Sequence, residues 1–292
     1  MEGNFGTIGE RKVPVMTYND KQIRALAVQI RKNILRAIAS KGTGHVGGSL
    51  SIADALAVLY GGVMNIDPER PQKEERDYLV LSKGHCGPAV YAALAARGYF
   101  EERMLDTLNQ NNTILPSHTD RNKTPGVDMT TGSLGQGASL AAGAAFADKL
   151  AGRKNYTYLI LGDGELDEGQ VWEAALFAAH QKLTHLITLI DVNGKQLDGT
   201  TDEVCSLGSI EKKFEAFGFR AIPVKNGNDP EQIYKALEEA LKEKEYPSAL
   251  VLYTAKGAGI THYAQMLNCH STAVKKEDLE SFYAELNRRA AG

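Results

Sequence analysis

The sequence predicts an α/β fold, with a mostly parallel sheet and helices on both faces. Short apolar runs typical of buried strands alternate with longer segments in which apolar residues recur every three or four positions. Strands that alternate with helices pair in parallel, because each helix serves as the crossover connection. No stretch rich in Pro, Gly and Ser divides the chain, so we expect residues 19–292 to form one domain after an irregular arm at residues 1–18.

The first helix is expected at residues 20–41. Asn19 and Asp20 are good N-cap residues, the isoleucines that follow recur at helical spacing, and Gly42 lies just past the end. Pro88 and Pro230 each stand at the first position of a later helix. The further helices are expected at residues 52–60, 88–97, 138–151, 168–181, 209–217, 229–244 and 275–289.

Buried strands are expected where Leu, Ile, Val and Tyr form short runs. These runs lie at residues 77–82, 156–161, 186–192, 220–224 and 249–253. In an open α/β sheet, ligands bind beyond the carboxyl ends of the strands. Glycines and polar residues gather at these ends, namely Gly84, the segment 162–164, the pair 193–194 and Gly257. The sequence therefore predicts a ligand site at one edge of the sheet.

The composition is that of a globular protein without a nucleic-acid or membrane partner. The 292 residues include 33 basic and 36 acidic ones, for a net charge of −3, and no basic cluster stands out. The longest run of apolar residues and glycine, residues 55–64, is about half the length of a membrane-spanning helix. The N-terminus lacks the features of a signal peptide. Because the 3 cysteines are an odd and sparse set, we expect a reducing, cytoplasmic location.

The motif Gly162-Asp163-Gly164 and the later Asn193 carry the most specific chemistry. Each follows an apolar run, and Asn193 comes about thirty residues after Asp163. A carboxylate and an amide oxygen suit Mg²⁺ when phosphate oxygens and water complete its octahedron. The glycines let a diphosphate approach main-chain N–H groups, and the helix that begins near Glu168 presents its N-terminus to that charge. A Gly-Asp-Gly alone is more often a plain turn, but the pair at this spacing favours a metal–diphosphate site.

This pair resembles the thiamine diphosphate fingerprint, and the surrounding segments are similar to those of the transketolase family. They are GHVGGS (44–49), DYLVLSKGH (77–85), TTGSLGQG (130–137), GDGELDEGQVWEA (162–174), LIDVNGKQLDG (189–199) and FEAFGF (214–219). The resemblance extends over residues 20–292 and covers only the diphosphate-binding half of a full-length transketolase. It implies the thiamine diphosphate-binding fold, and the chain looks like the N-terminal subunit of a split transketolase.

The resemblance also implies a set of cofactor and metal residues. The metal, Mg²⁺ or in its place Ca²⁺ or Mn²⁺, would be bound by Asp163, Asn193 and the backbone carbonyl of Lys195. Glu168 matches a buried carboxylate tied to the assembly of the enzyme and to cofactor activation. The full set implied for thiamine diphosphate is His85, Gly132, Leu134, Gly162, Asp163, Gly164, Glu168, Asn193 and Leu197.

Four of the 7 histidines sit beside Gly or Ser in loops: His45, His85, His118 and His270. A lone loop histidine is usually a surface residue, but sugar chemistry needs proton shuttles near pH 7. By resemblance all four are catalytic, with His45 and His118 on the donor hydroxyls and His85 and His270 near the diphosphate and reaction centre. We interpret the neighbouring Lys83 as a solvated side chain in preference to a phosphate contact.

The activity implied is transfer of a two-carbon ketol unit from a ketose phosphate to an aldose phosphate, as in the pentose phosphate pathway. The expected partners are a C-terminal, pyrimidine-binding subunit that supplies the catalytic glutamate, and a second copy of this chain, in an α2β2 assembly. Glu168 and the helix that carries Trp172 are the candidates for the contact between copies. Three alternatives stay open: half of a deoxyxylulose-phosphate synthase, the α subunit of a 2-oxoacid dehydrogenase, and a non-catalytic cofactor-binding scaffold.

Overall fold

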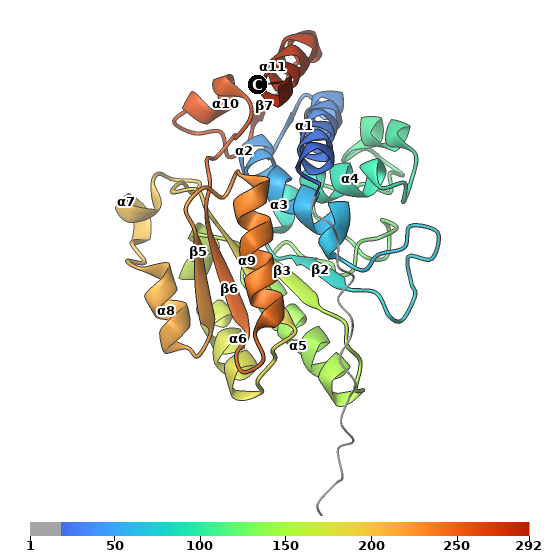
Figure 1. The fold of residues 1–292 in the computed structure, drawn as a ribbon. Helices are drawn as coiled ribbons and strands as arrows, with labels where there is room; N and C mark the ends of the chain where they lie inside the picture. Colours follow the sequence, from blue (N-terminus) through green and yellow to red (C-terminus); the bar gives the residue numbers. More distant parts are fainter. Residues whose placement is uncertain (1–18, 292) are drawn as a thin grey trace, which may run out of the picture.

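A parallel sheet of 5 strands forms the centre of the computed structural model, which describes residues 19–291 (Figure 1). The strands lie in the spatial order β2-β3-β4-β6-β5, and every neighbouring pair is parallel. Their bounds are Tyr78–Leu81 (β2), Thr157–Gly162 (β3), Leu186–Val192 (β4), Arg220–Val224 (β5) and Ser248–Tyr253 (β6). The predicted fold class is confirmed, and β4 and β5 have the bounds expected from the sequence.

The sheet is buried on both faces, which explains why its strands read as continuous apolar runs. Alternate residues of each strand contribute to two separate cores: Leu79 and Leu81 belong to one, and Val80 to the other. The first core includes residues of α1 (Asp20–Lys41), α3 (Ala53–Val58), α4 (Gly87–Ala96) and α9 (Pro230–Lys242), together with residues of shorter and C-terminal helices. Those of the second are α5 (Gln136–Leu150), α6 (Gly169–His180) and α8 (Ile210–Ala216).

The longest helix, α1, begins and ends at the residues that the sequence indicates. The side chain of Asn19 accepts a hydrogen bond from the backbone N–H of Gln22 at 3.1 Å, and Gly42 closes the helix in the left-handed conformation with φ of 89°. Ile30, Ile34 and Ile38 are completely buried against the first core. Burial of this apolar stripe, at about 25 cal/mol per Å², is what holds the helix on the domain.

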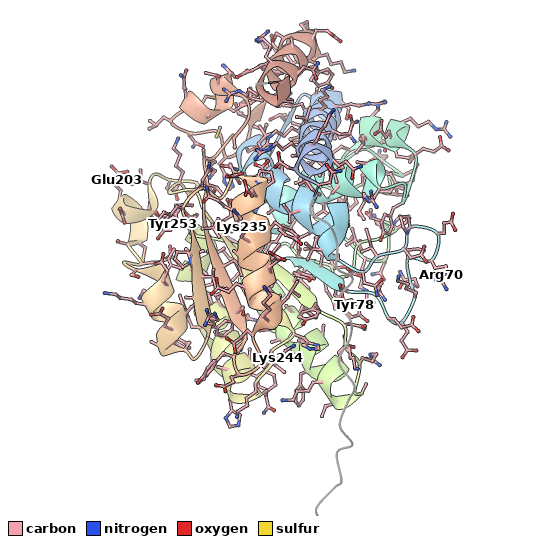
Figure 2. All side chains as sticks on the ribbon, in the orientation of Figure 1. Arg70, Tyr78, Glu203, Lys235, Lys244 and Tyr253 are labelled. Atoms are coloured by element: carbon pink, nitrogen blue, oxygen red, sulfur yellow. The ribbon has the colours of Figure 1, made fainter. Side chains whose placement is uncertain are left out.

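Helix α9 shows the same agreement between local signals and structure. Asp229 caps it by accepting from the backbone N–H of Glu231 at 3.2 Å, with Pro230 at the first helical position. The exposed face carries Lys235, which pairs with Glu231 one turn away at 2.7 Å (Figure 2). The helix ends at Lys242, two residues before the predicted end, and Lys244 lies in the following turn.

The prediction of one helix at residues 52–60 is wrong in its bounds. A helix α2 (Val46–Ser51) precedes α3, and a π-helical turn η1 (Leu59–Val63) follows it. Gly47 and Gly48 lie within α2, where the lack of a side chain allows close packing. A Cβ atom on Gly47 would lie 2.5 Å from the carbonyl oxygen of Cys269.

Several short elements have no clear signal in the sequence. The helices of this kind are α7 (Thr201–Cys205) and α10 (Thr261–Gln265). The single 3-10 turns are η2 (Gly84–Cys86), η3 (Glu102–Thr107), η4 (Gly164–Asp167) and η5 (Lys276–Asp278). The last of these replaces the start of the final predicted helix, so α11 covers Leu279–Ala291. The predicted arm at residues 1–18 lies outside the described residues.

A two-stranded antiparallel sheet joins segments that are far apart in the chain. It pairs β1 (Thr43–Gly44) with β7 (Thr272–Ala273), next to α1 and α11 (Figure 1). His45 directly follows β1 and His270 lies two residues before β7, so this pairing brings two of the candidate histidines together.

Two findings bear on the environment of the protein. Between residues 19 and 291 we find no helix with both the length and the apolar composition that crossing a membrane requires. Cys86, Cys205 and Cys269 are all free thiols.

Candidate active site

Four adjacent strands, β2, β3, β4 and β6, end at the same edge of the sheet and surround a cavity of about 190 Å³. Most of the candidate residues meet here, although they come from distant parts of the chain. The cavity is lined by Gly48, Lys83, His85, Leu134, Gly162, Asp163, Gly164, Glu165, Asn193, Lys195, Gln196, Leu197, Lys256 and His270. The predicted location of the site at the carboxyl edge therefore agrees with the structure.

Asp163 is a buried carboxylate that faces this cavity, with only 3% of its surface exposed. Its Oδ1 accepts from the backbone N–H of Gly164 at 2.9 Å, and its Oδ2 from that of Gly194 at 2.6 Å. Burial and the nearby Asp191 raise the pKa of Asp163 to about 6, although the two N–H groups oppose the change. Among the described residues no Lys, Arg or His forms an ion pair with it. A buried carboxylate without a direct ion pair is a favourable place for a cation.

Asn193 and Lys195 lie beside Asp163, as the resemblance implies. The side-chain Nδ2 of Asn193 donates to Asp191 at 2.9 Å, and its Oδ1 accepts from the backbone N–H of Lys195 at 3.2 Å. The carbonyl oxygen of Lys195 accepts from the ammonium of Lys256 at 2.7 Å. In the described part of the chain no group of three or more His, Cys, Asp and Glu could hold a metal ion. Any metal here would therefore depend on amide and carbonyl oxygens besides Asp163.

Lys83 is buried, so the interpretation of this residue as a solvated side chain is wrong. Only 2% of Lys83 is exposed, and its Nζ lies 2.6 Å from Oδ2 of Asp191 and 3.0 Å from the carbonyl oxygen of Gly48. Burial by itself lowers the pKa of Lys83, but the Asp191 carboxylate outweighs it and the net shift is upward. Burial likewise opposes ionisation of Asp191, yet Lys83 keeps the pKa of that carboxyl below its usual value. The two side chains form a charged pair beneath the cavity.

Glu165, directly after the Gly-Asp-Gly motif, is a buried carboxylate in the single chain. The turn η4 directs Glu165 inward, where its Oε1 accepts from Ser82 at 2.5 Å and from the N–H of Gly135 at 2.9 Å, and its Oε2 from the N–H of Gly162 at 3.1 Å. Glu168 stands at the N-cap of α6 and is exposed on the surface of the single chain. Glu165 thus holds three cavity segments together.

The four candidate histidines form one cluster. The ring centroids lie 5.1 Å apart for His45 and His85, 5.2 Å for His45 and His270, and 4.9 Å for His85 and His270. His118 is 5.9 Å from His45 and lies over Gly132, where a Cβ atom would approach its ring to 3.3 Å. Thr131 fixes this loop, because it bonds to Thr119 and to the end of β2.

All four imidazoles are neutral at pH 7. Burial, together with the charges of its neighbours, lowers the pKa of His45 and of His85 to about 4 and that of His270 to about 3. The pKa of His118 is also lowered, by burial and by His85. A neutral imidazole can both donate and accept a hydrogen bond, which suits the recognition of hydroxyl groups and proton transfer.

Leu134 and Leu197, the expected packing residues, lie at the cavity wall from opposite segments. Leu197 is 58% exposed, and the preceding residue Gln196 has a buried Nε2 that lacks a hydrogen-bond partner among the described residues. The side chain of Gln196 covers Gly164, where a Cβ atom would lie 2.9 Å from it.

Lys256, Asp191 and Gln196 were not singled out from the sequence. Lys256 follows β6 just as Asp163 follows β3, so its place after an apolar run next to Gly257 was a usable signal. Burial lowers the pKa of Lys256, and so does the neighbouring Lys83. Asp191 was recognisable as a lone acidic residue inside the apolar run 186–192. Nothing in the sequence marked Gln196.

Comparison with known proteins identifies the family. A family model described as the transketolase thiamine diphosphate binding domain matches residues 21–288. The chain belongs to the transketolase family. Its fold is similar to that of transketolase from Leishmania mexicana, with a TM-score of 0.87 and 34% identity over 91% of this chain and 41% of that one. The chain thus spans less than half the length of these full-length enzymes, in agreement with the predicted resemblance to their diphosphate-binding half.

Two relatives match along nearly their whole length and are named as subunits. The 6-deoxy-6-sulfo-D-fructose transketolase subunit SqwG of Clostridium sp. (strain MSTE9) is 48% identical over 90% of this chain and 95% of its own. An apulose-4-phosphate transketolase subunit from Phocaeicola vulgatus is 34% identical over 92% of this chain and 96% of its own. The expected similarity to the N-terminal subunit of a split transketolase is confirmed.

Proposed function

We propose that this chain is the N-terminal subunit of a two-subunit transketolase that binds Mg²⁺ and thiamine diphosphate at the cavity around Asp163. The observation that supports this most directly is the buried Asp163 carboxylate, which faces the cavity with two N–H donors and no described counter-ion. Alternatives among other thiamine diphosphate enzymes are less well supported, since the relatives described above are transketolases. A non-catalytic scaffold would not need the intact set of Asp163, Asn193 and four neutral histidines.

The residues present fit a divalent cation. Asp163, Asn193 and the carbonyl oxygen of Lys195 would hold it, and hard oxygen ligands of this kind suit Mg²⁺, with Ca²⁺ or Mn²⁺ as substitutes. The carbonyl oxygen of Lys195 accepts from the Lys256 ammonium with one lone pair, and a carbonyl oxygen has a second lone pair for a cation.

The residues also fit a diphosphate. Lys256 and the unpartnered Nε2 of Gln196 lie in the same cavity as Gly162 and Gly164, so donors and open backbone are available to an anion. When bound, thiamine diphosphate supplies a nucleophilic thiazolium carbon for ketol transfer. The protein would supply orientation and proton management. His45 and His118 would bind the hydroxyls of the donor, and His85 and His270 would hold or move a proton close to the diphosphate.

The donor is expected to be a ketose with an acidic group at its far end, and the acceptor an aldose phosphate. The name of the relative with 48% identity refers to a sulfonated ketose, and that of the relative from Phocaeicola vulgatus to a sugar phosphate. Both donor classes therefore belong in an assay. The histidine cluster faces the hydroxylated part of either sugar, so it does not discriminate between them.

Two partners complete the proposal. A C-terminal subunit would supply the pyrimidine-binding domain with the catalytic glutamate, because the relatives are named as subunits. A second copy of this chain would bind at α5 and α6, giving an α2β2 heterotetramer in the cytoplasm. These helices expose a set of large apolar side chains, Leu140, Leu150, Leu176 and Phe177. Exposed apolar patches of this kind mark interaction surfaces.

A coupled ketol-transfer assay tests the proposal. The purified chain is measured alone and after mixing with a C-terminal-half transketolase subunit from the same organism, with a ketose phosphate and a 6-sulfonated ketose as donors. We expect negligible turnover by the chain alone and turnover dependent on Mg²⁺ and thiamine diphosphate in the mixture. Robust ketol transfer by the chain alone would contradict the two-subunit proposal, and no thiamine diphosphate binding by the mixture would contradict the function.

A further inference from the structure

Asp191 is a fully buried carboxylate directly beneath the proposed cation site. It lies in β4, two residues before Asn193, and none of its surface is exposed. Its Oδ2 accepts from Ser51 at 2.7 Å, from Lys83 at 2.6 Å and from Asn193 at 2.9 Å. Its Oδ1 accepts from Thr254 at 2.5 Å. One carboxylate thus receives hydrogen bonds from four side chains of four different segments.

These contacts determine which end of the Asn193 amide faces the cavity. Asp191, an ionised carboxylate, can only accept, so it selects the Nδ2 end. The backbone N–H of Lys195 can only donate, so it selects the Oδ1 end. The two neighbours agree, and together they exclude the flipped amide, which would point an N–H group at a cation.

We propose that Asp191 is a positioning residue that holds the Asn193 amide with its oxygen toward the cation, while Lys83 balances the buried charge of Asp191. This inference rests on the proposed function, since it concerns the cation of the cofactor site. Asp191 acts on Asn193 through this hydrogen bond, whereas its effect on Asp163 is one of charge. Its contribution is the orientation of one ligand before the cation binds.

The role of Lys83 follows from electrostatics. An ionised Asp191 without a partner would be strongly disfavoured in a fully buried position. The Lys83 ammonium, 2.6 Å away and itself 2% exposed, removes that penalty and leaves the carboxylate ionised. Oδ2 of Asp191 accepts from both Lys83 and Asn193, so the ion pair fixes the oxygen that orients the Asn193 amide.

A matched pair of double variants separates orientation from charge and stability. In Lys83→Met with Asp191→Asn, both charges are removed, but the amide oxygen at position 191 can still accept from Asn193. In Lys83→Met with Asp191→Leu, both charges and the acceptor are removed. Neither variant leaves Asp191 or Lys83 as an unpaired buried charge, and both lack Lys83. They differ in the acceptor at position 191, which serves Asn193 and also the hydroxyls of Ser51 and Thr254. Ser51→Ala is a further control, because it removes one donor to Asp191 and leaves the bond to Asn193.

The probe is Mn²⁺, titrated into the full chain with thiamine diphosphate and followed by electron paramagnetic resonance, with a protein-free titration subtracted. Thermal unfolding is recorded in parallel. Loss of an outer-sphere partner typically costs about 10–100-fold in metal affinity, so we expect at least about tenfold weaker Mn²⁺ binding in the Leu double variant. The Asn double variant and Ser51→Ala should stay within about threefold of the wild type, as expected when the ligand's hydrogen-bond partner is retained.

The outcomes discriminate clearly. Equal Mn²⁺ affinity of the two double variants overturns the positioning role. The positioning role is also overturned if the Mn²⁺ affinity falls in proportion to the melting temperature across all variants. Asp191 would then act only on the stability of the fold. A different result is that the wild type binds no more Mn²⁺ than thiamine diphosphate binds without protein, even when a C-terminal-half subunit is present. In that case the proposed function fails together with this inference.

Discussion

The guanidinium of Arg31 forms two hydrogen bonds with the carboxylate of Asp54, and both residues are almost fully buried, with 6% and 3% of their surfaces exposed. The pair joins α1 to α3 below the active site. Arg31 also donates from Nε to the carbonyl oxygen of Ala258 at 3.0 Å, and Asn228 donates to Asp54 at 3.1 Å. The loop that carries Lys256 is thereby connected to the helical core.

We predict that Asp54→Ala lowers the free energy of unfolding by about 3–5 kcal/mol, since removing one partner leaves Arg31 with an unpaired buried charge. Urea unfolding of the full chain measures the loss. Lys235→Ala is the control: it breaks the exposed pair with Glu231 on α9 and should cost less than about 0.5 kcal/mol. Equal, small losses in both variants would contradict the assigned importance of the buried pair.

Asp163→Ala should abolish Mg²⁺-dependent binding of thiamine diphosphate. The substitution removes the one charged oxygen ligand of a cation that accepts near-octahedral oxygen coordination. Calorimetric titration of thiamine diphosphate with and without Mg²⁺, using the assembled protein, measures the effect. Since the wild-type carboxylate is buried without a described counter-ion, the variant's melting temperature without cofactor should not fall. Unchanged cofactor affinity would refute the metal assignment.

The histidine cluster predicts that stability decreases toward acid pH. Burial lowers the pKa of His45 and of His85 to about 4, and that of His270 to about 3, from an ordinary value of about 6.5. Between these values the unfolded chain binds protons that the folded chain does not, so the free energy of unfolding rises with pH. The stabilising effect is complete above about pH 6.5 and is lost as the pH falls toward 4.

The pKa of Asp163 is raised to about 6. This residue therefore makes the free energy of unfolding fall with rising pH in part of the same range. The effect of the histidines is obtained by comparing the wild type with a variant. The wild type is compared with a His85→Asn, His270→Asn double variant by urea unfolding at several pH values from 7 to 4. The variant should show the weaker loss of stability. Parallel curves would mean that the cluster is not buried and neutral.

The regular elements were predictable because local signals and tertiary packing agree in them. Asn19 and Gly42 delimit α1, and Asp229 with Pro230 starts α9, each through a hydrogen bond or a backbone preference that acts within one turn. The helix α2 was not predictable from local signals, since Gly47 packs against Cys269, more than two hundred positions away, and Gly48 against Cys86.

The sequence predicts site residues that directly follow a strand, as Asp163 and Asn193 do. It does not predict which charged residues are buried in the fold. Lys83 and Glu168 are both charged residues in a family motif, and only the packing reveals that Lys83 is enclosed and Glu168 exposed. Trp172, on the helix expected at a contact between copies, packs within the chain on Phe214 and Phe217, with centroids 5.2 Å away.

His118→Ala should lower ketol transfer and leave cofactor affinity within about threefold, because His118 is absent from the lining of the cavity around Asp163. Positioned acid–base groups typically contribute about 100–10,000-fold in rate. Steady-state kinetics of the assembled protein, paired with thiamine diphosphate titration, separates the two effects. A large loss of cofactor affinity would assign this histidine to the cofactor instead of the sugar.

The last prediction concerns the contact between two copies of the chain. Leu176 on α6 is 62% exposed, and Phe177 beside it is 39% exposed while its ring meets Phe146 of α5 at 5.4 Å between centroids. Leu140 adds a further exposed apolar side chain on α5. Burial of such a face in a dimer stabilises the dimer by about 25 cal/mol for each Å² of apolar surface. A charge placed at the centre of the face would lose its hydration on association, which opposes dimer formation.

We therefore expect Leu176→Glu to shift the purified chain from dimer to monomer in analytical ultracentrifugation at micromolar concentration, and to leave the melting temperature of the monomer unchanged. Leu267→Glu is the matched control, since Leu267 is 90% exposed and lies in the loop after α10, away from α5 and α6. It should not change the sedimentation of the chain alone. If Leu176→Glu sediments as the wild type does, the second copy does not bind at this face. If only Leu267→Glu loses the dimer, the contact between copies lies at the loop after α10.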